Sequence, residues 1–240
     1  MIALGLETTT DRLSVAARRP DGRTAVRTAE GARKHAAALF PLVAAVLEEL
    51  GAGLHRVGTL VLADGPGSFT GLRVGWAAAK ALARTRKGLA VWTASTMLVR
   101  AAGASAPRGA RVLVVTSALR GQLYAASYRL ELPGAVETIA KPALATPDSL
   151  RLEEPDLLVA DAEEKLVDRL ADQLAVPLIR GPASWPQAAA LLALVGAVGG
   201  ARRIEDLDAW EPLYGRPAEA QARWEARHGR ELHDPSSHRR

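Results

Sequence analysis

Residues 64–75 read D-G-P-G-S-F-T-G-L-R-V-G and lie between an apolar run at 59–63 and an alanine-rich segment at 76–83. Gly65, Gly67 and Gly71 therefore fall between an expected strand and an expected helix. This order often creates an anion-binding corner, because the first amides of a helix lack internal partners and carry partial positive charge. A tight turn before a capped helix that binds nothing is an alternative, and the spacing alone leaves both open.

The two common nucleotide-binding patterns are absent from this stretch. A P-loop needs Gly-Lys-Ser/Thr at its end, but Leu72-Arg73 follows the last glycine of the corner. A dinucleotide fingerprint has its glycines one residue closer together and an acidic residue downstream, which is missing.

The composition is that of an ordinary globular protein of 240 residues, enough for one large domain or two small ones. The net charge of +5 permits nucleic-acid binding but does not require it, because no long basic run exists. There is no cysteine, and the five histidines form no zinc-hydrolase pair, so we expect neither thiolate chemistry nor a metal site.

The start of the sequence reads directly into a strand, without a basic and apolar leader. The apolar stretch at 188–198 is too short to span a bilayer. We therefore expect a cytoplasmic protein with no membrane contact.

Two similar halves follow each other along the chain. The first is expected to hold strands at 1–7, 13–19, 24–28 and 58–63, with helices at about 33–50 and 71–84. The second repeats the pattern, with strands at 111–116, 122–130, 157–160 and 176–179 and helices at 163–174 and 184–198. This order predicts a duplicated α/β unit, with a cleft where the strand–turn corners of two lobes face each other.

Five motifs together resemble one family. They are the glycine corner G-P-G-S-F-T-G-L-R-V-G, L-G-L-E-T-T-T at 4–10, H-A-A-A-L-F-P at 35–41, R-G-Q-L-Y at 120–124 and E-P-L-Y-G-R-P-A-E-A at 211–220. In this order they resemble the TsaB (YeaZ) family of bacterial tRNA threonylcarbamoyladenosine (t6A) biosynthesis proteins. The resemblance covers about residues 1–220, and nothing similar is identified for 221–240.

The resemblance implies an α/β fold of the actin-like (ASKHA) type, with two ribonuclease-H-like lobes whose mixed β-sheets are flanked by helices. The lobes would span 1–103 and 104–215, followed by a C-terminal extension at 216–240.

The resemblance also implies a non-catalytic scaffold role in t6A synthesis. The catalytic paralogue TsaD would transfer the threonylcarbamoyl group to the tRNA adenosine next to the anticodon. A TsaE-like ATPase would join the complex, tRNA would be reached through the complex, and the chain alone would pair with itself. No cofactor is implied.

The chain departs from the family pattern at two positions, where Glu7 and Ser117 stand in place of the usual Asp. In actin-like phosphotransferases, carboxylates at such turns position a metal and a water near phosphate. Glu7 retains a carboxylate on a longer arm, whereas Ser117 supplies no charge. We therefore expect a chain that is not itself an enzyme.

The partner surface is predicted on the first-lobe helices, as a four-helix interface with the partner. Its residues are His35, Leu39, Leu42, Val43, Val46, Gly71, Val74, Gly75, Ala78 and Leu82. The alternative is that both helices pack only on their own sheet, which also needs an apolar stripe.

A vestigial phosphate corner is the second predicted site, made of Glu7, Gly65, Gly67, Ser68, Thr70 and Arg73. The structural alternative is that Ser68 or Thr70 caps the helix and Arg73 pairs with a carboxylate.

Three other functions stay open on the sequence alone. An actin-like ATP-dependent kinase or ATPase would need the carboxylate that Ser117 lacks. A glycoprotease would need metal-ligand histidines. A free-standing tRNA-binding protein would show salt-dependent affinity for tRNA.

Overall fold

The computed structural model describes residues 1–31, 35–118, 123–146, 150 and 154–212. Three parts of the sequence-based predictions lie outside these described residues. They are residues 120–122 of the R-G-Q-L-Y motif, the residues after Pro212 in the motif at 211–220, and the extension at 216–240. None of the helices within the described ranges combines the length and apolar character that a bilayer crossing requires.

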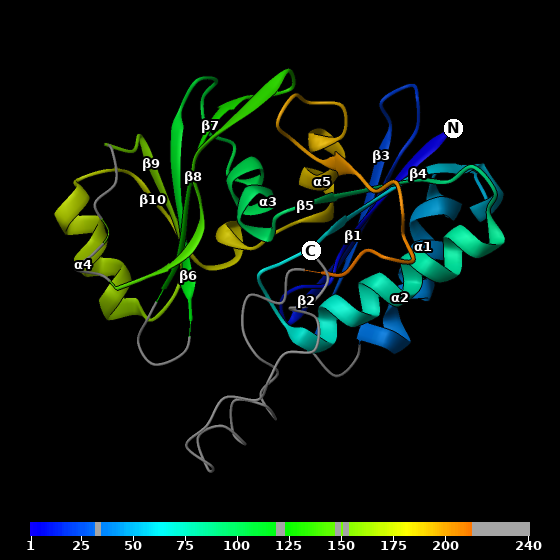
Figure 1. Cartoon of the computed structure of the whole chain (residues 1–240), viewed down its shortest axis with the longest axis horizontal. Coiled ribbons are helices and arrows are strands. Elements are labelled where there is room, and N and C mark those ends of the chain that lie inside the picture. Colours follow the sequence, from blue (N-terminus) through cyan, green and yellow to red (C-terminus); the bar gives the residue numbers. More distant parts are fainter. Residues whose placement is uncertain (32–34, 119–122, 147–149, 151–153, 213–240) are drawn as a thin grey trace, which may run out of the picture.

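The first lobe is built on a mixed sheet in the order β11-β5-β4-β1-β2-β3 (Figure 1). Strands β1 to β3 form an antiparallel meander, while β4 is parallel to β1 and β5 is parallel to β4. The elements of this half are β1 (Ile2–Glu7), β2 (Arg12–Arg18), β3 (Thr24–Glu30), α1 (His35–Glu49), β4 (Val57–Ala63), α2 (Phe69–Thr85), β5 (Ala90–Ala94) and α3 (Thr96–Gly103).

The second sheet repeats this topology in the order β10-β9-β6-β7-β8. Strands β6 to β8 form the meander, and β9 and β10 add to it in parallel. The elements of this half of the chain are β6 (Arg111–Ser117), β7 (Leu123–Glu131), β8 (Ala135–Ala145), β9 (Leu157–Asp161), α4 (Glu164–Leu174), β10 (Leu178–Ile179), the short 3-10 helix η5 (Gly181–Ser184), α5 (Ala188–Leu194) and β11 (Arg202–Arg203), which belongs to the first sheet. Apart from β11, the two sheets share one strand order, in agreement with the predicted duplication.

Helices α3 and α5 form a layer between the two sheets (Figure 1). Helix α3 packs on β6 and β7 of the second sheet, whereas α5 packs on β1, β2 and β4 of the first. One apolar core runs through this layer and includes Val61 and Met97 as well as Val114 and Leu191. The two lobes are therefore joined by a shared core as well as by the chain.

Helices α1 and α2 cover the outer face of the first sheet, and α4 lies against the outer face of the second. Leu39, Val43 and Val46 of α1 pack with Leu82 of α2 against the sheet, each at most 4% exposed. The apolar stripe of both helices therefore faces inward.

The chain returns to the first lobe near its end. Strand β11 pairs antiparallel with β5, and Trp210 packs edge-on against Trp76 of α2 at 6.3 Å between ring centres. The division at 103/104 and at 215/216 stays a prediction, and this return shows that residues after 200 add a strand to the first sheet.

The predicted helix at 184–198 is shorter in the structure, where α5 spans Ala188–Leu194. Pro186 disfavours helical backbone at the residue before it, and Trp185 is extended at ψ 143°. Val195 is also extended, which ends the helix.

Candidate functional site at the lobe boundary

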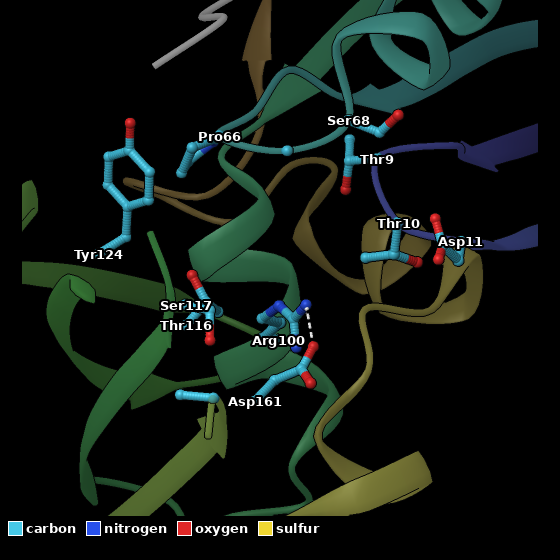
Figure 2. A pocket seen from close by; sticks show the side chains of 12 residues that line it. Thr9, Thr10, Asp11, Pro66, Ser68, Arg100, Thr116, Ser117, Tyr124 and Asp161 are labelled. Atoms are coloured by element: carbon cyan, nitrogen blue, oxygen red, sulfur yellow. Dashed lines mark hydrogen bonds and ion pairs between the residues drawn. The ribbon is translucent and has the colours of Figure 1, made fainter. Parts of the chain in front are cut away.

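A cleft of about 520 Å³ lies between the lobes, where the ends of their strands meet (Figure 2). The first lobe lines it with Thr9, Thr10, Asp11, Pro66, Gly67 and Ser68. The second lobe contributes Thr116, Ser117, Tyr124, Asp161 and Ala162, and helix α3 contributes Arg100. The lining is rich in hydroxyl groups, and Ser117 occupies the position where a carboxylate was expected in an active enzyme.

The spacing of the glycines has a structural cause. Gly71 and Gly75 lie four residues apart, so they share one side of the start of α2, and Gly67 comes just before the cap residue Ser68. A Cβ at Gly67 would lie 2.5 Å from the Thr9 carbonyl oxygen, and one at Gly75 would lie 2.7 Å from Thr8 Oγ1. These glycines let the turn after β1 lie directly on α2.

Hydrogen bonds hold this turn in place. Thr8 Oγ1 donates to the Gly71 carbonyl oxygen at 2.8 Å, and the Ser68 amide donates to the Thr9 carbonyl oxygen at 2.6 Å. Ser68 also caps α2, since its hydroxyl accepts a bond from the Gly71 amide at 3.2 Å. The glycine corner therefore has a clear structural role, which was the alternative to a phosphate corner.

The six residues of the predicted corner do not converge on one point. Gly67 and Ser68 line the cleft, whereas Glu7, Gly65, Thr70 and Arg73 are not among the residues that line it. The Arg73 guanidinium lies 4.0 Å from the centre of the Phe69 ring. A phosphate-binding role for the set stays a prediction.

Glu7 is fully buried and bonded to its own turn. Its Oε1 accepts bonds from the amide and the hydroxyl of Thr9, both at 2.6 Å. Burial raises the pKa of Glu7 to about 7, opposed by these bonds and by the charge of Arg100. The Glu7 carboxyl does not line the cleft. The extra methylene of Glu, compared with Asp, therefore does not bring the carboxyl into the cleft to hold a metal or a water.

Arg100 and Asp161 form the ionic contact of the cleft, 2.7 Å apart (Figure 2). The sequence-based prediction missed both residues. Arg100 is a lone cation in an otherwise apolar helix, and that isolation is a signal that could have been noticed.

Among the described residues, no group of three or more His, Cys, Asp and Glu side chains is arranged to hold a metal ion.

The predicted interface residues are mostly inside the first lobe. His35, Leu39, Val43, Val46, Gly71, Gly75, Ala78 and Leu82 are buried, while Leu42 and Val74 are half-buried. Burial also lowers the pKa of His35. The apolar side chains of this set pack in the core of the first lobe, and a pairing role for the set stays a prediction.

The exposed side of α1 is apolar as well. Ala36, Ala37, Phe40, Pro41 and Ala44 are all exposed, with Phe40 at 46%. No charged side chain occurs between His35 and Leu47. The predicted partner surface includes none of these five exposed residues, and its role in pairing stays a prediction.

Comparison with known proteins identifies the family to which the chain belongs. Residues 26–184, more than half of its length, match the family model described as TsaD, tRNA N6-adenosine threonylcarbamoyltransferase. The chain belongs to this family. The TsaB protein of Escherichia coli (strain K12) is 33% identical over 150 residues, which is 60% of this chain and 64% of that protein.

Haemophilus influenzae TsaB is 38% identical over 80 residues, covering 33% of this chain and 34% of that protein. The chain thus spans less than two thirds of the curated relatives that it matches. YeaZ from Pseudomonas aeruginosa has the same fold, with a TM-score of 0.68 and 27% identity over 82% of this chain and 92% of that one.

A second structure from that organism, described as similar to the peptidase YeaZ, gives a TM-score of 0.71 and 25% identity, covering 90% of this chain and 99% of that one. The predicted resemblance to TsaB (YeaZ) is confirmed, as is the predicted α/β fold of two mixed sheets flanked by helices.

Proposed function

We propose that the chain is a non-catalytic subunit in t6A synthesis, which pairs with a TsaD-type catalytic paralogue that performs threonylcarbamoyl transfer to tRNA. The family match and the TsaB relatives support the pathway. The whole-protein role is carried over from relatives that the chain matches over part of their length.

The exposed side of α1 between His35 and Leu47, which has no charged side chain, is the main support for the pairing. Five exposed residues, spaced as one side of a helix, are apolar or proline, and Phe40 is the largest. Exposed apolar helix faces on soluble proteins are commonly covered by a partner. The half-buried Leu42 and Val74 extend this surface toward α2, which lies beside α1 (Figure 1).

The cleft supports a role without chemistry of its own. Glu7 is withdrawn from it, Ser117 brings no charge, and Arg100 is committed to Asp161 and to a backbone carbonyl. Asp11 and Asp161 do place carboxylates in the lining, but neither stands at the two positions where the family's carboxylates are expected. These placements favour a scaffold over a kinase or ATPase.

The remaining members of the complex follow from the same proposal. A TsaE-like ATPase would join the pair, and tRNA would be contacted through the complex. In the absence of the paralogue, the α1 surface would pair with a second copy of the chain, in competition with the paralogue.

The experiment measures the affinity of the chain for the TsaD-type protein of the same genome. Phe40→Asp should weaken binding at least about 10-fold, because a charge replaces an aromatic anchor in a desolvated surface. Leu144→Asp is the matched control, since Leu144 is 52% exposed on β8 of the other lobe and should bind as wild type. Equal affinity of both variants would remove α1 as the pairing surface.

A further inference from the structure

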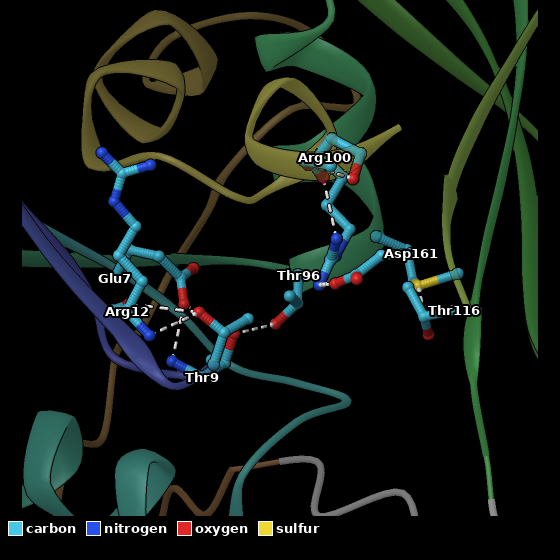
Figure 3. A network of polar contacts seen from close by, with 11 residues as sticks. Glu7, Thr9, Arg12, Thr96, Arg100, Thr116 and Asp161 are labelled. Atoms are coloured by element: carbon cyan, nitrogen blue, oxygen red, sulfur yellow. Dashed lines mark hydrogen bonds and ion pairs between the residues drawn. The ribbon is translucent and has the colours of Figure 1, made fainter. Parts of the chain in front are cut away.

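Arg100 lines the cleft and hydrogen-bonds two segments of the second lobe, at Asp161 and Ser184 (Figure 3). It lies on α3 and is 5% exposed. One terminal nitrogen donates to the Ser184 carbonyl oxygen at 2.7 Å and the other to Asp161 Oδ2 at 2.7 Å. Asp161 ends strand β9 of the second sheet, whereas α3 follows the last parallel strand of the first.

The start of the same helix is tied to the first lobe. The Thr96 amide donates to the Gly65 carbonyl oxygen at 2.8 Å, and the Thr96 hydroxyl bonds Thr9 Oγ1 at 3.2 Å. Thr9 in turn bonds Glu7. Thr96 and Arg100 are four residues apart, so they lie on one side of α3, one turn from each other.

The Arg100–Asp161 ion pair differs from the surface ion pairs of the chain because its guanidinium is buried. A buried guanidinium is strongly disfavoured unless carboxylate and carbonyl oxygens replace its water, and removing one partner leaves an uncompensated charge. The exposed pair Arg129–Glu137 has a similar length of 2.6 Å but lies within the second sheet, with both side chains at least 40% exposed. Such a pair contributes little.

We propose that Arg100 is a built-in brace that fixes the two lobes around the cleft, so that no bound ligand is needed to hold them. In two-lobed proteins that close on a ligand, contacts to the ligand set the angle between the lobes. Here a protein cation makes those contacts, to Asp161 and Ser184 on one side, while its helix holds the Thr9 turn on the other.

Hydrogen exchange of the isolated chain tests the brace. In Arg100→Met, which keeps an unbranched apolar stem and removes the guanidinium, amides at 64–70, 94–100 and 157–162 should exchange at least 10-fold faster than in wild type. Asp161→Asn should give the same pattern. Arg129→Met is the matched control and should leave these amides unchanged. Wild-type exchange in both cleft variants, or equal acceleration in the control, would overturn the proposal.

A double variant tests whether Arg100 and Asp161 act through one shared contact or through two independent effects. Asp161→Asn should add less than 2-fold to the exchange rate in the Arg100→Met background, because the contact is already lost. Additive effects would contradict a shared brace. If Arg100→Met does not fold, Asp161→Asn decides alone, since the Asp161 side chain is 39% exposed and its amide replacement keeps the shape.

Adding a nucleotide tests the alternative, in which a bound ligand and not Arg100 holds the two lobes together. Saturating Mg²⁺ with ADP should leave exchange at 64–70 and 157–162 unchanged in wild type. Protection of these amides by the nucleotide would show that a ligand, and not Arg100, joins the lobes. The test uses the chain alone, so its result is independent of whether the chain pairs with a TsaD-type protein.

Discussion

Thr8 Oγ1 donates a hydrogen bond to the carbonyl oxygen of Gly71, and a side chain at position 71 would overlap the carbonyl oxygen of Thr8. This contact joins the turn after β1 to the first turn of α2. The contact between the Thr8 turn and the backbone of residue 71 is enough to require a glycine at this position. A bound anion is not needed to explain it.

Gly71→Ala should destabilise the fold by about 3 kcal/mol, since the new methyl group meets backbone that cannot move aside as a flexible side chain would. Gly103→Ala is the matched control. Position 103 ends α3, and a Cβ there would contact only Ala190 at an ordinary 3.8 Å. Its effect should stay within about 1 kcal/mol of wild type. Denaturant unfolding measures both, and similar losses for the two would contradict the packing explanation.

Glu7→Gln should stabilise the protein at neutral pH. The pKa of Glu7 is raised by burial from 4.5 to about 7, so between these values the unfolded chain releases a proton that the folded chain keeps. The free energy of unfolding of wild type therefore falls as pH rises through this window. Above it, the accumulated loss is about 3 kcal/mol.

The difference in stability between the Glu7→Gln variant and wild type should be near zero at pH 4 and grow toward pH 8. Thermal unfolding of both proteins across this range measures it. A constant difference would show that Glu7 does not hold its proton in the folded chain.

Leu82→Asp should unfold the first lobe instead of acting on partner binding alone. Leu82 is 4% exposed in the core beneath α2, where a carboxylate loses its water without gaining a partner. A loss above about 4 kcal/mol is expected. Ala77→Asp on the exposed side of the same helix should keep the fold. Circular dichroism and denaturant unfolding distinguish the two, and a stable Leu82→Asp would contradict the burial assigned to this stripe.

Arg202→Ala should loosen the final strand from the first sheet. Arg202 bonds Asp64 at 3.0 Å, and burial raises the pKa of Asp64 against the opposing charge of Arg202. Loss of the partner of a buried carboxyl costs about 1–3 kcal/mol. Arg203→Ala is the control, because Arg203 lies 3.8 Å from an exposed Glu205 and should have little effect. Unfolding followed by tryptophan fluorescence reports both; equal effects would contradict a role for the Asp64 contact.

Much of the fold could be predicted from the sequence, because β1 to β4 and α1 carry clear apolar patterns between strong turn signals. Helix α3 was missed because Thr96 to Ala101 are all buried, so the helix has no exposed polar face to give its sequence an amphipathic pattern. Strand β5 is only five residues long. Strand β8 was missed because it lies at a sheet edge, is largely exposed and contains Pro142.

The site was harder to predict than the fold. Periodicity identifies the apolar stripe of α1 but not whether a sheet or a partner covers it, and it gave no warning that the opposite side is also apolar. Arg100 and Asp161 are 61 residues apart, and only the fold brings them together. The glycines let the Thr8–Thr9 turn lie directly on the start of α2, and their spacing in the sequence did not identify that contact.

The central claim is that this chain acts by pairing and not by catalysis. The most direct test is t6A formation on tRNA in a reaction reconstituted from the TsaD-type protein of the same genome, its TsaE-like ATPase and a source of threonylcarbamoyl-adenylate. We predict modification only when this chain is added, none from this chain without the TsaD-type protein, and a strong loss with Phe40→Asp. Full modification without the chain, or modification by the chain alone, would contradict the account.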